Sequence, residues 1–365
     1  MKPLMDEWGV VERLLPRGWR AAAREQGAFR RARYIKEPST LLRVLLFHAV
    51  NGAGLRQSVA LLKAAGVADI SQVALLKRLR GAGNWLASIA AGLCEGLRDR
   101  PRPKGAMRLR VVDGTTIRAP ASRGTDWRLH YTLDLSTLQC DWQEVTDSTG
   151  AERLERVPVQ KDDVLLADWN YFTALGVAHV ADAQAHVVIR LRWTHPRLLD
   201  RKGRVCRALD LAESVKTGQT GDWPVSLPLP GGRRIAARVV ALRLPAPLAE
   251  RARQRARRAA NKKQHQIQPD TLKAAEYVML FTTLPAEQLS AADVLELYRY
   301  RWQVELAFKR LKQLLRIGQL PHKDRAAATG WIQAKLVVAL LLETLFRSAR
   351  IFSPWGYELQ PGQAS

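Results

Sequence analysis

Cysteine is scarce in this chain of 365 residues, and its distribution suggests no pairing. Cys94, Cys140 and Cys206 are odd in number and far apart in sequence, unlike a disulfide framework or a cysteine-rich zinc site. The seven histidines are scattered as well, with no His-x-x-x-His pair on a helix. We therefore expect a reducing compartment, the cytosol, and no soft-metal site. Any metal should be an oxygen-bound Mg²⁺ or Mn²⁺.

Long apolar runs are also lacking. The longest, at 336–342, is interrupted by Lys335 and Glu343 and is too short to span a bilayer. Residues 1–20 are polar and charged, so no signal peptide is expected there. The sequence thus gives no reason to expect a membrane partner.

Acidic residues are outnumbered by basic ones. Lys and Arg total 58 against 34 Asp and Glu, which gives a net charge of +24. The excess is spread along the chain, and such a surface attracts a polyanion over a Debye length or more. Nucleic acid is therefore the first candidate partner. A chain of this length would usually form two or three domains.

Residues 38–98 have the pattern of α-helices separated by glycine-containing breaks. Ser71 is a plausible N-cap for a basic segment at 72–80, which carries Lys77, Arg78 and Arg80. Two short helices joined by a glycine turn, the second of them basic, indicate a DNA-binding helix-turn-helix. An ordinary small helical bundle has the same pattern. We assign residues 1–100 to a helical N-terminal DNA-binding domain.

After a proline-containing linker at 99–105, the pattern changes to short strands. They are expected at 107–118, 129–135, 164–167 and 186–193, with a short helix at 171–179. Residues 196–275 then interrupt this pattern of strands. They are rich in glycine and proline and contain small strands, such as 235–244, and an arginine-rich helical run at 250–263. That run is either a solvated charged helix or, as we prefer here, an element that contacts a nucleic-acid backbone. A strand at 277–282 and a long helix follow. This order predicts an α/β core that contains an insertion.

The long helix carries a notable set of polar residues. Tyr298, Arg301, Glu305 and Lys312 follow one another at spacings of three, four and seven. On a continuous helix they project within roughly 60° of each other, and Lys309 lies on the same face. An apolar stripe runs beside them, no Gly or Pro occurs between 291 and 317, and Gly318 is expected to end the helix. The alternative is a solvated helix face on which Glu305 and Lys309 form an ordinary ion pair.

Two aspartates stand where apolar strands end or are interrupted. Asp113 ends or interrupts the expected strand at 109–112, and Asp168 follows the apolar strand at 164–167. Adjacent strand ends would bring both carboxylates over one cleft. The competing roles are an Asp-Gly turn for Asp113 and a helix N-cap for Asp168. Three further acids, ranked lower because they do not end an apolar strand so directly, are Asp162, Asp163 and Asp182.

Together, Asp113, Asp168 and Glu305 are the right complement for two Mg²⁺ ions that assist in-line displacement at phosphorus. At this point the sequence resembles the bacterial DDE transposases of the insertion sequence 4 family, over roughly residues 40–345. The Tyr-x2-Arg-x3-Glu-x6-Lys signature is matched without gaps, and so are the two aspartate motifs, Val-Asp-Gly-Thr at 112–115 and Asp-x-x-Tyr at 168–171. Asn170 stands where the family often has Gly.

The resemblance implies a ribonuclease H-like catalytic core at 106–195 and 276–347, interrupted by a β-rich insertion at 196–275 and followed by a tail at 348–365. It implies that Asp113, Asp168 and Glu305 bind two Mg²⁺ ions, for which Mn²⁺ can substitute. The residues implied to contact double-stranded DNA are Tyr298, Arg301, Lys309, Lys312 and Arg190. In some members of the family an aromatic residue stacks on a flipped base; Trp302 or Trp223 would have this role, and the alternative for each is an ordinary packing residue. A homodimer in the bacterial cytoplasm, associated with the nucleoid, is expected.

Three rival functions remain open. The first is a nuclease of similar core that only hydrolyses DNA. The second is a catalytically silent or truncated transposase-derived DNA-binding protein, an alternative favoured by the Pro/Gly-containing tail at 353–365, where relatives often continue. The third, RNA binding, fits the charge but leaves the four-residue signature unexplained.

Overall fold

The computed structural model describes residues 8–98, 103, 105–194, 197–262, 264–321 and 324–351. The linker expected at 99–105 lies mostly outside these residues. Of the tail expected at 348–365, residues 348–351 belong to the last helix, and 353–365 lie outside the described residues.

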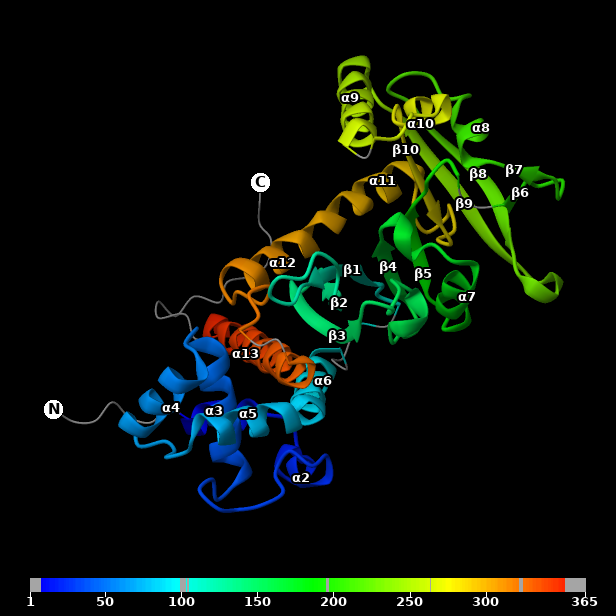
Figure 1. The fold of residues 1–365 in the computed structure, drawn as a ribbon. Helices are drawn as coiled ribbons and strands as arrows, with labels where there is room; N and C mark the ends of the chain where they lie inside the picture. The colour runs from blue at the N-terminus through cyan, green and yellow to red at the C-terminus, as the bar shows by residue number, and fades with distance from the viewer. Residues whose placement is uncertain are drawn as a thin grey trace.

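Helices come first along the chain (Figure 1). They are α1 (Trp8–Leu14), α2 (Trp19–Glu25), α3 (Pro38–Val50), α4 (Leu55–Ala64), α5 (Gln72–Gly81) and α6 (Gly83–Arg98). Ser71 caps α5 as predicted, because its side chain accepts a hydrogen bond from the amide of Ala74 at 3.2 Å. In α5, however, Arg78 donates to the carbonyl of Arg31, and Arg80 pairs with Asp324. Two of the three basic side chains noted in the sequence of this helix thus bind other parts of the protein.

The strands in the described part of the chain form one mixed sheet of ten, in the order β3-β2-β1-β4-β5-β10-β9-β8-β6-β7. The strands are β1 (Arg108–Ile117), β2 (Trp127–Asp134), β3 (Gln139–Asp147), β4 (Asp163–Ala167), β5 (His186–Arg190), β6 (Leu198–Leu199), β7 (Val205–Cys206), β8 (Thr220–Pro228), β9 (Arg234–Arg243) and β10 (Tyr277–Thr282). The strands β1, β2 and β3 form an antiparallel meander, whereas β1, β4 and β5 run parallel. The bounds of β10 are those predicted from the sequence, whereas β3 was not predicted.

The segment predicted as an insertion does not form a separate sheet. Its long hairpin, β8 and β9, continues the main sheet because β9 pairs along the whole length of β10. Its helices are α8 (Ala208–Ala212), α9 (Ala246–Lys262) and α10 (Pro269–Ala274). Figure 1 shows these elements as a lobe at one end of the sheet.

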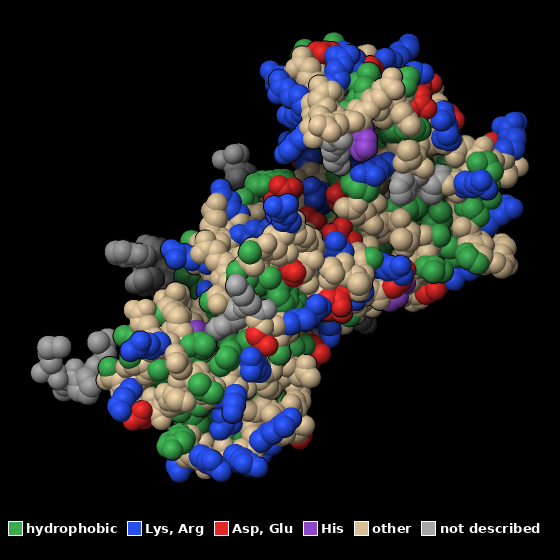
Figure 2. Space-filling model, in the orientation of Figure 1, with side chains coloured by type: hydrophobic (Ala, Val, Ile, Leu, Met, Phe, Trp, Pro, Cys, Tyr) green, Lys and Arg blue, Asp and Glu red, His purple; other side chains and the backbone are tan. Residues whose placement is uncertain are grey.

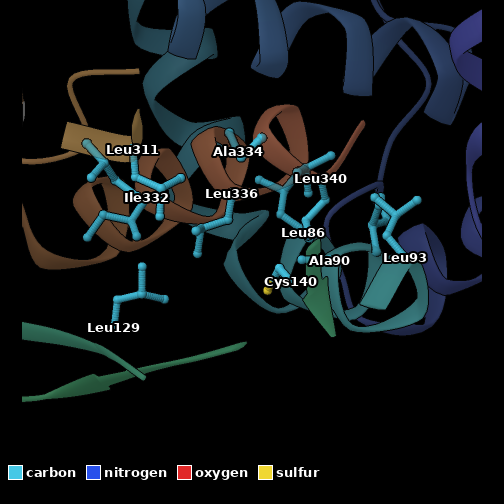
Figure 3. Close-up of a cluster of buried hydrophobic side chains, with 14 of the residues drawn as sticks. Leu86, Ala90, Leu93, Leu129, Cys140, Leu311, Ile332, Ala334, Leu336 and Leu340 are labelled. Carbon is cyan, nitrogen blue, oxygen red and sulfur yellow. The ribbon is translucent and has the colours of Figure 1, made fainter. Parts of the chain in front are cut away.

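The sheet has a hydrophobic core on each face. Along β1, Val111 belongs to one core and its neighbour Val112 to the other, as expected from the alternation of side chains along a strand. The second core includes side chains of α7 (Ala174–Asp182) and α8. The first continues from the sheet into the N-terminal helices and α13 (Arg325–Ile351), and Figure 3 shows part of it. The thiols of Cys94 and Cys140, distant in sequence, lie 3.8 Å apart there.

Helix α13 joins the two ends of the described chain, because it packs against α3, α5 and α6. Residues Arg325–Phe346 are long and apolar enough to cross a membrane by length and composition, a longer stretch than the run recognised in the sequence. More than half of that stretch is buried inside the protein, for example Ile332, Leu336 and Leu340 in Figure 3. The apolar character of the helix is accounted for by this packing.

Candidate active site

Strand register places the two aspartates side by side. In the parallel pair β1–β4, Arg108 stands opposite Asp163 and Val112 opposite Ala167. The next residues on the two strands are Asp113 and Asp168. They fall on the sheet face of the first core, because side chains alternate and Val111 and Leu166 belong to that core. The sequence prediction that the aspartates lie together at neighbouring strands agrees with this arrangement.

Of the two competing local roles considered for the aspartates, the structure shows one. Asp113 lies within β1 rather than at its end, so an Asp-Gly turn is not formed there. Its carboxylate accepts a hydrogen bond from the amide of Gly114 at 2.7 Å. Asp168 caps the short 3₁₀ helix η2 (Trp169–Tyr171) and accepts from the amide of Trp169 at 2.6 Å. The N-cap role considered for Asp168 is therefore real, and one carboxylate oxygen serves it.

The single helix predicted over 291–317 is wrong in detail. It consists of α11 (Ala291–Arg299), a 3₁₀ turn η4 (Tyr300–Trp302) and α12 (Gln303–Gln313). The helix ends at Gln313, before Gly318, and the residue with a left-handed backbone in the following turn is Arg316, with φ of 52°. The predicted apolar stripe is nevertheless buried at Val304, Phe308 and Leu311, and it holds α12 against the first core.

Arg301 connects two of the three predicted catalytic carboxylates. Its Nη1 lies 3.2 Å from Oδ2 of Asp113, and its Nη2 lies 3.1 Å from Oε1 of Glu305. Glu305 therefore pairs with Arg301, not with Lys309 as in the solvated-face alternative. The side chains of Arg301 and Asp113 are each 20% exposed, whereas that of Glu305 is 62% exposed. The guanidinium is thus a cation held between carboxylates that come from β1 and α12.

The electrostatics of the site are governed by crowding of negative charge. The pKa of Asp113 is raised to about 6, mainly by burial. The hydrogen bond from the Gly114 amide and the charge of Arg301 lower this pKa, whereas the charges of Asp168 and Glu152 raise it. Burial lowers the pKa of Arg301. The electrostatic effects of Tyr298 and of the nearby carboxylates are larger together, so the pKa of Arg301 is raised overall. The charge of Asp168, which follows the neighbouring strand β4, raises the pKa of both Asp113 and Arg301.

The residues predicted to contact DNA lie around this cluster. The hydroxyl of Tyr298 donates to the carbonyl of Ala167 at 3.2 Å, so it faces the end of β4 in this DNA-free chain. Lys309 and Lys312 are exposed on α12, and Arg190 is exposed at the end of β5. The side chain of Trp302 is also exposed, at 49%.

Trp223 has a different setting from Trp302. It lies on β8 in the insertion and is half-buried, with its ring against the backbone of Gly221.

Sequence reasoning missed Glu152 and Tyr171. Glu152 lies against Gly114, where a Cβ would come within 2.9 Å of its Oε1. Tyr171 is 1% exposed, and its hydroxyl has no hydrogen-bond partner in the described structure. Burial and then the charges of Glu152 and Asp113 raise its pKa. Glu152 has no signal in the sequence, because a loop brings it to β1, whereas Tyr171 belongs to the Asp-x-x-Tyr motif.

A stacked pair beside Asp168 was missed as well. The guanidinium of Arg192 lies over the ring of Trp169, 2.9 Å from its centroid. Both residues are thereby held beside the site, at the ends of β5 and β4.

The three rival acids have other roles. Asp162 adopts a left-handed conformation with φ of 65° in the turn before β4. Asp163 is fully buried and paired with Arg108. Asp182 is an exposed partner of Arg233. Ranking them below Asp113 and Asp168 agrees with these positions.

The donor set suits a hard divalent cation. Carboxylate oxygens are the ligands that Mg²⁺ and Mn²⁺ prefer, and here such oxygens already surround one cation, the guanidinium of Arg301. Within the described residues, no three His, Cys, Asp or Glu side chains are gathered closely enough to hold a metal ion. The residues therefore fit a divalent metal in chemistry, and Arg301 would have to share or release its carboxylates.

Comparison with known proteins decides the family. Residues 104–341 match the family described as transposase DDE domain. The chain is also 34% identical to InsL of insertion sequence element IS186A in Escherichia coli (strain K12), over 96% of each chain. It is 34% identical to the transposase for insertion sequence element IS421 of Escherichia coli, again over 96% of each chain. This chain belongs to the DDE transposases.

The transposase is thus an enzyme that cleaves DNA and transfers its strands, and the resemblance drawn from the motifs is confirmed. Among solved structures, a piggyBac transposase synaptic complex with hairpin DNA matches with a TM-score of 0.44 and 11% identity, covering 94% of this chain and 74% of that chain. The matched family segment contains Asp113, Asp168 and Glu305. DDE transposases generally use divalent metal ions, in agreement with the oxygen donors assembled here.

Proposed function

We propose that this transposase binds the inverted-repeat ends of an insertion sequence, and that Asp113, Asp168 and Glu305 bind two Mg²⁺ ions for DNA cleavage and strand transfer. Mn²⁺ would substitute. The observation that carries the proposal is the position of Arg301, which holds Asp113 and Glu305 on one cation beside Asp168.

The core is proposed to be ribonuclease H-like. Its support is the strand order β3-β2-β1-β4-β5, with an antiparallel meander followed by two parallel strands. Asp113 on the central strand β1 and Asp168 after its neighbour β4 then face a helix that supplies Glu305. The helical segment 1–100 is proposed as a DNA-binding domain, although its side chains share a core with α13.

When bound, the metal ions would activate the attacking water or 3′-hydroxyl and stabilise the leaving oxygen at phosphorus. The protein's part is to hold its carboxylates in place and ionised. The register of β1 and β4 positions Asp113 and Asp168, and the Gly114 amide and Arg301 favour the charged form of Asp113 against burial. Arg301, once its carboxylates are otherwise neutralised, is free to bind a phosphate of the substrate.

DNA contacts are proposed for the cations around the site. Lys309 and Lys312 follow Glu305 on α12, Arg190 ends β5 beside β4, and all three are exposed. Tyr298 would contact a phosphate only after its hydroxyl leaves the Ala167 carbonyl. Because two transposon ends must be held together, we propose a homodimer acting on DNA in the bacterial cytoplasm.

The test is cleavage of a duplex that carries the terminal inverted repeat of this element, with Mg²⁺ or Mn²⁺. We expect nicking at the repeat boundary by the wild type, and its loss in Asp113→Asn and Glu305→Gln while DNA binding persists. Glu296→Gln is the matched control, because Glu296 is an exposed acid of α11 that pairs with Arg299 and should leave nicking unchanged.

A supplied 3′-hydroxyl end separates transposition from simple hydrolysis. Strand-transfer products support the proposal, whereas nicking without transfer would indicate a nuclease. A wild type that binds the repeats and never cuts with either metal would instead be a silent DNA-binding protein.

A further inference from the structure

Helix α9 in the insertion has two opposite faces. The inner face carries Ala249, which is buried, and Arg253, whose guanidinium donates to Glu250 at 2.6 Å and to Glu276 at 2.5 Å. Glu276 immediately precedes β10, so this arginine anchors the helix to the sheet. Arg253 is thus a structural cation, and its charge is already compensated.

The outer face is a stripe of uncompensated positive charge. Its members are Arg251, Arg255, Arg258 and Lys262. Their spacings of four, three and four bring them within roughly 60° of one another, on the side of the helix opposite to Ala249. All four are exposed, and none forms an ion pair with a described carboxylate. Figure 2 shows Lys and Arg side chains gathered on the part of the surface formed by α9.

This arrangement is unfavourable for the free protein. Like charges three and four residues apart on a helix repel one another, and the stripe contains three such consecutive pairs. Little apolar burial offsets the repulsion, because Ala249 is the one described residue of α9 that is fully buried. Such a stripe becomes favourable when a polyanion neutralises it.

We propose that the α9 stripe, Arg251, Arg255, Arg258 and Lys262, binds the phosphate backbone of duplex DNA outside the catalytic site. This proposal rests on the proposed function, since DNA bound at the transposon end is the partner. The stripe is about 16 Å long at 1.5 Å per residue. One DNA strand presents about five phosphates over that distance, so the spacing of cations and anions is comparable.

The position of α9 supports a role in holding the end of the element. After α9, the chain passes through α10 and β10 into α11, and α11 leads into the turn that carries Arg301 (Figure 1). A duplex bound by α9 is thereby connected, through the strand β10 and the helices α10 and α11, to the carboxylate site.

The experiment is the salt dependence of DNA binding by the full chain, measured by fluorescence anisotropy. The probes are a 40-bp duplex with the element's terminal inverted repeat, a 40-bp duplex of shuffled sequence, and an RNA duplex of equal length. The test variant changes all four stripe residues to Gln, which preserves helix propensity. The control variant changes four exposed cations elsewhere in the same insertion, none of which forms an ion pair with a described carboxylate: Arg201, Lys202, Lys216 and Arg234. Both variants lower the net charge equally.

For the repeat duplex we expect the slope of log K against log salt to fall in magnitude by about 3.6 in the stripe variant, with at least a ~10-fold loss of affinity at 0.15 M salt. The control variant should keep most of the wild-type slope. The stripe variant should also melt no lower than the wild type, because repulsion has been removed.

Equal losses in the two variants would overturn the proposal, since general charge would then explain them. A loss confined to the RNA duplex would overturn it as well. If the wild type fails to bind the repeat, the proposed function fails together with the stripe. If it binds and cuts while the stripe variant keeps its slope, only the stripe proposal fails.

Discussion

Arg108 and Asp163 stand opposite each other where β1 and β4 begin to pair, and two hydrogen bonds of 2.8 Å join their side chains. Five residues further along each strand are Asp113 and Asp168. Because register is constant along a strand pair, the buried pair at one end determines which side chains meet at the other. A slip of one residue would turn one aspartate to the opposite face of the sheet.

The first prediction concerns that buried pair. Asp163→Asn leaves both Arg108 and Arg110 short of a carboxylate that each now contacts, in a fully buried setting. An uncompensated buried charge is expected to lower the free energy of unfolding by about 3–5 kcal/mol. Urea unfolding measures it, with Asp182→Asn as the control, because the exposed pair of Asp182 and Arg233 should contribute little. A loss as small as in the control would show that the pair does not hold the strands.

The second prediction concerns the pH dependence of Asp113. Its pKa, about 6, is above its ordinary value near 4, so between these values the folded state binds more protons than the unfolded state. The contribution of this group to stability therefore falls as pH rises through that window, and the ionised carboxylate is destabilising at pH 7. In metal-free protein, Asp113→Asn should raise the free energy of unfolding at pH 7 by about 1–3 kcal/mol and change it little at pH 4.

The difference between mutant and wild type, measured by thermal or urea unfolding across pH 4 to 7 with EDTA present, checks this. Asp147→Asn should change the stability in the opposite direction and lower the free energy of unfolding at pH 7, because hydrogen bonds from Thr149 lower the pKa of Asp147. A stabilisation by Asp113→Asn that is the same at pH 4 and pH 7 would contradict the linkage argument.

The third prediction concerns competition between Arg301 and a metal ion. In the free protein the guanidinium holds oxygens of Asp113 and Glu305, so a divalent cation must displace or share it. Arg301→Gln should therefore strengthen Mn²⁺ binding several-fold in the absence of DNA, while it weakens binding of the repeat duplex. Calorimetric titration at pH 8 avoids competition from protons, since Asp113 is then ionised.

Arg299→Gln is the matched control, because Arg299 pairs with Glu296 on the exposed face of the preceding turn. It should leave the Mn²⁺ affinity unchanged. Weaker Mn²⁺ binding by Arg301→Gln would mean that the arginine organises the carboxylates for the metal rather than competing with it.

The fourth prediction concerns Tyr298. Its hydroxyl ties α11 to the carbonyl of Ala167, next to Asp168. Tyr298→Phe should lower the free energy of unfolding by about 1 kcal/mol through loss of this hydrogen bond. Tyr300→Phe should have no such effect, since Tyr300 is exposed at 48%. Equal effects of the two substitutions in urea unfolding would show that the contact does not hold the helix.

Much of the site was predictable because its signals are local. An apolar strand ending in Asp168 and a helix with Arg301 and Glu305 at a spacing of four can both be read from neighbouring residues. The spacing also indicated that these last two side chains share a face, as their ion pair shows. It could not indicate that the same guanidinium reaches Asp113, because that contact joins residues 188 positions apart.

Other features could not be predicted from neighbouring residues, because tertiary contacts determine them. Glu152 comes from a loop whose path is determined by tertiary packing, and nothing near it in sequence marks an active-site acid. The insertion reads as a separate β-rich unit, yet the pairing of β9 with β10 merges it into one sheet. The 3₁₀ turn at Tyr300–Trp302 interrupts a sequence that contains no Gly or Pro and has helical periodicity throughout.

The fifth prediction distinguishes the two tryptophans considered for stacking on a base. Trp302 lies in the turn beside Arg301 with half of its surface exposed, whereas Trp223 packs against Gly221 on β8. A base stacked on an exposed aromatic ring contributes about 1–3 kcal/mol, or roughly 5- to 150-fold in affinity. Trp302→Ala should therefore abolish any preference for a repeat duplex with an unpaired terminal base over a blunt one, as measured by competition binding. Trp223→Ala should keep that preference and instead lower the melting temperature, because its half-buried ring packs against Gly221. Loss of the preference in Trp223→Ala alone would place the stacking site in the insertion, away from the carboxylates.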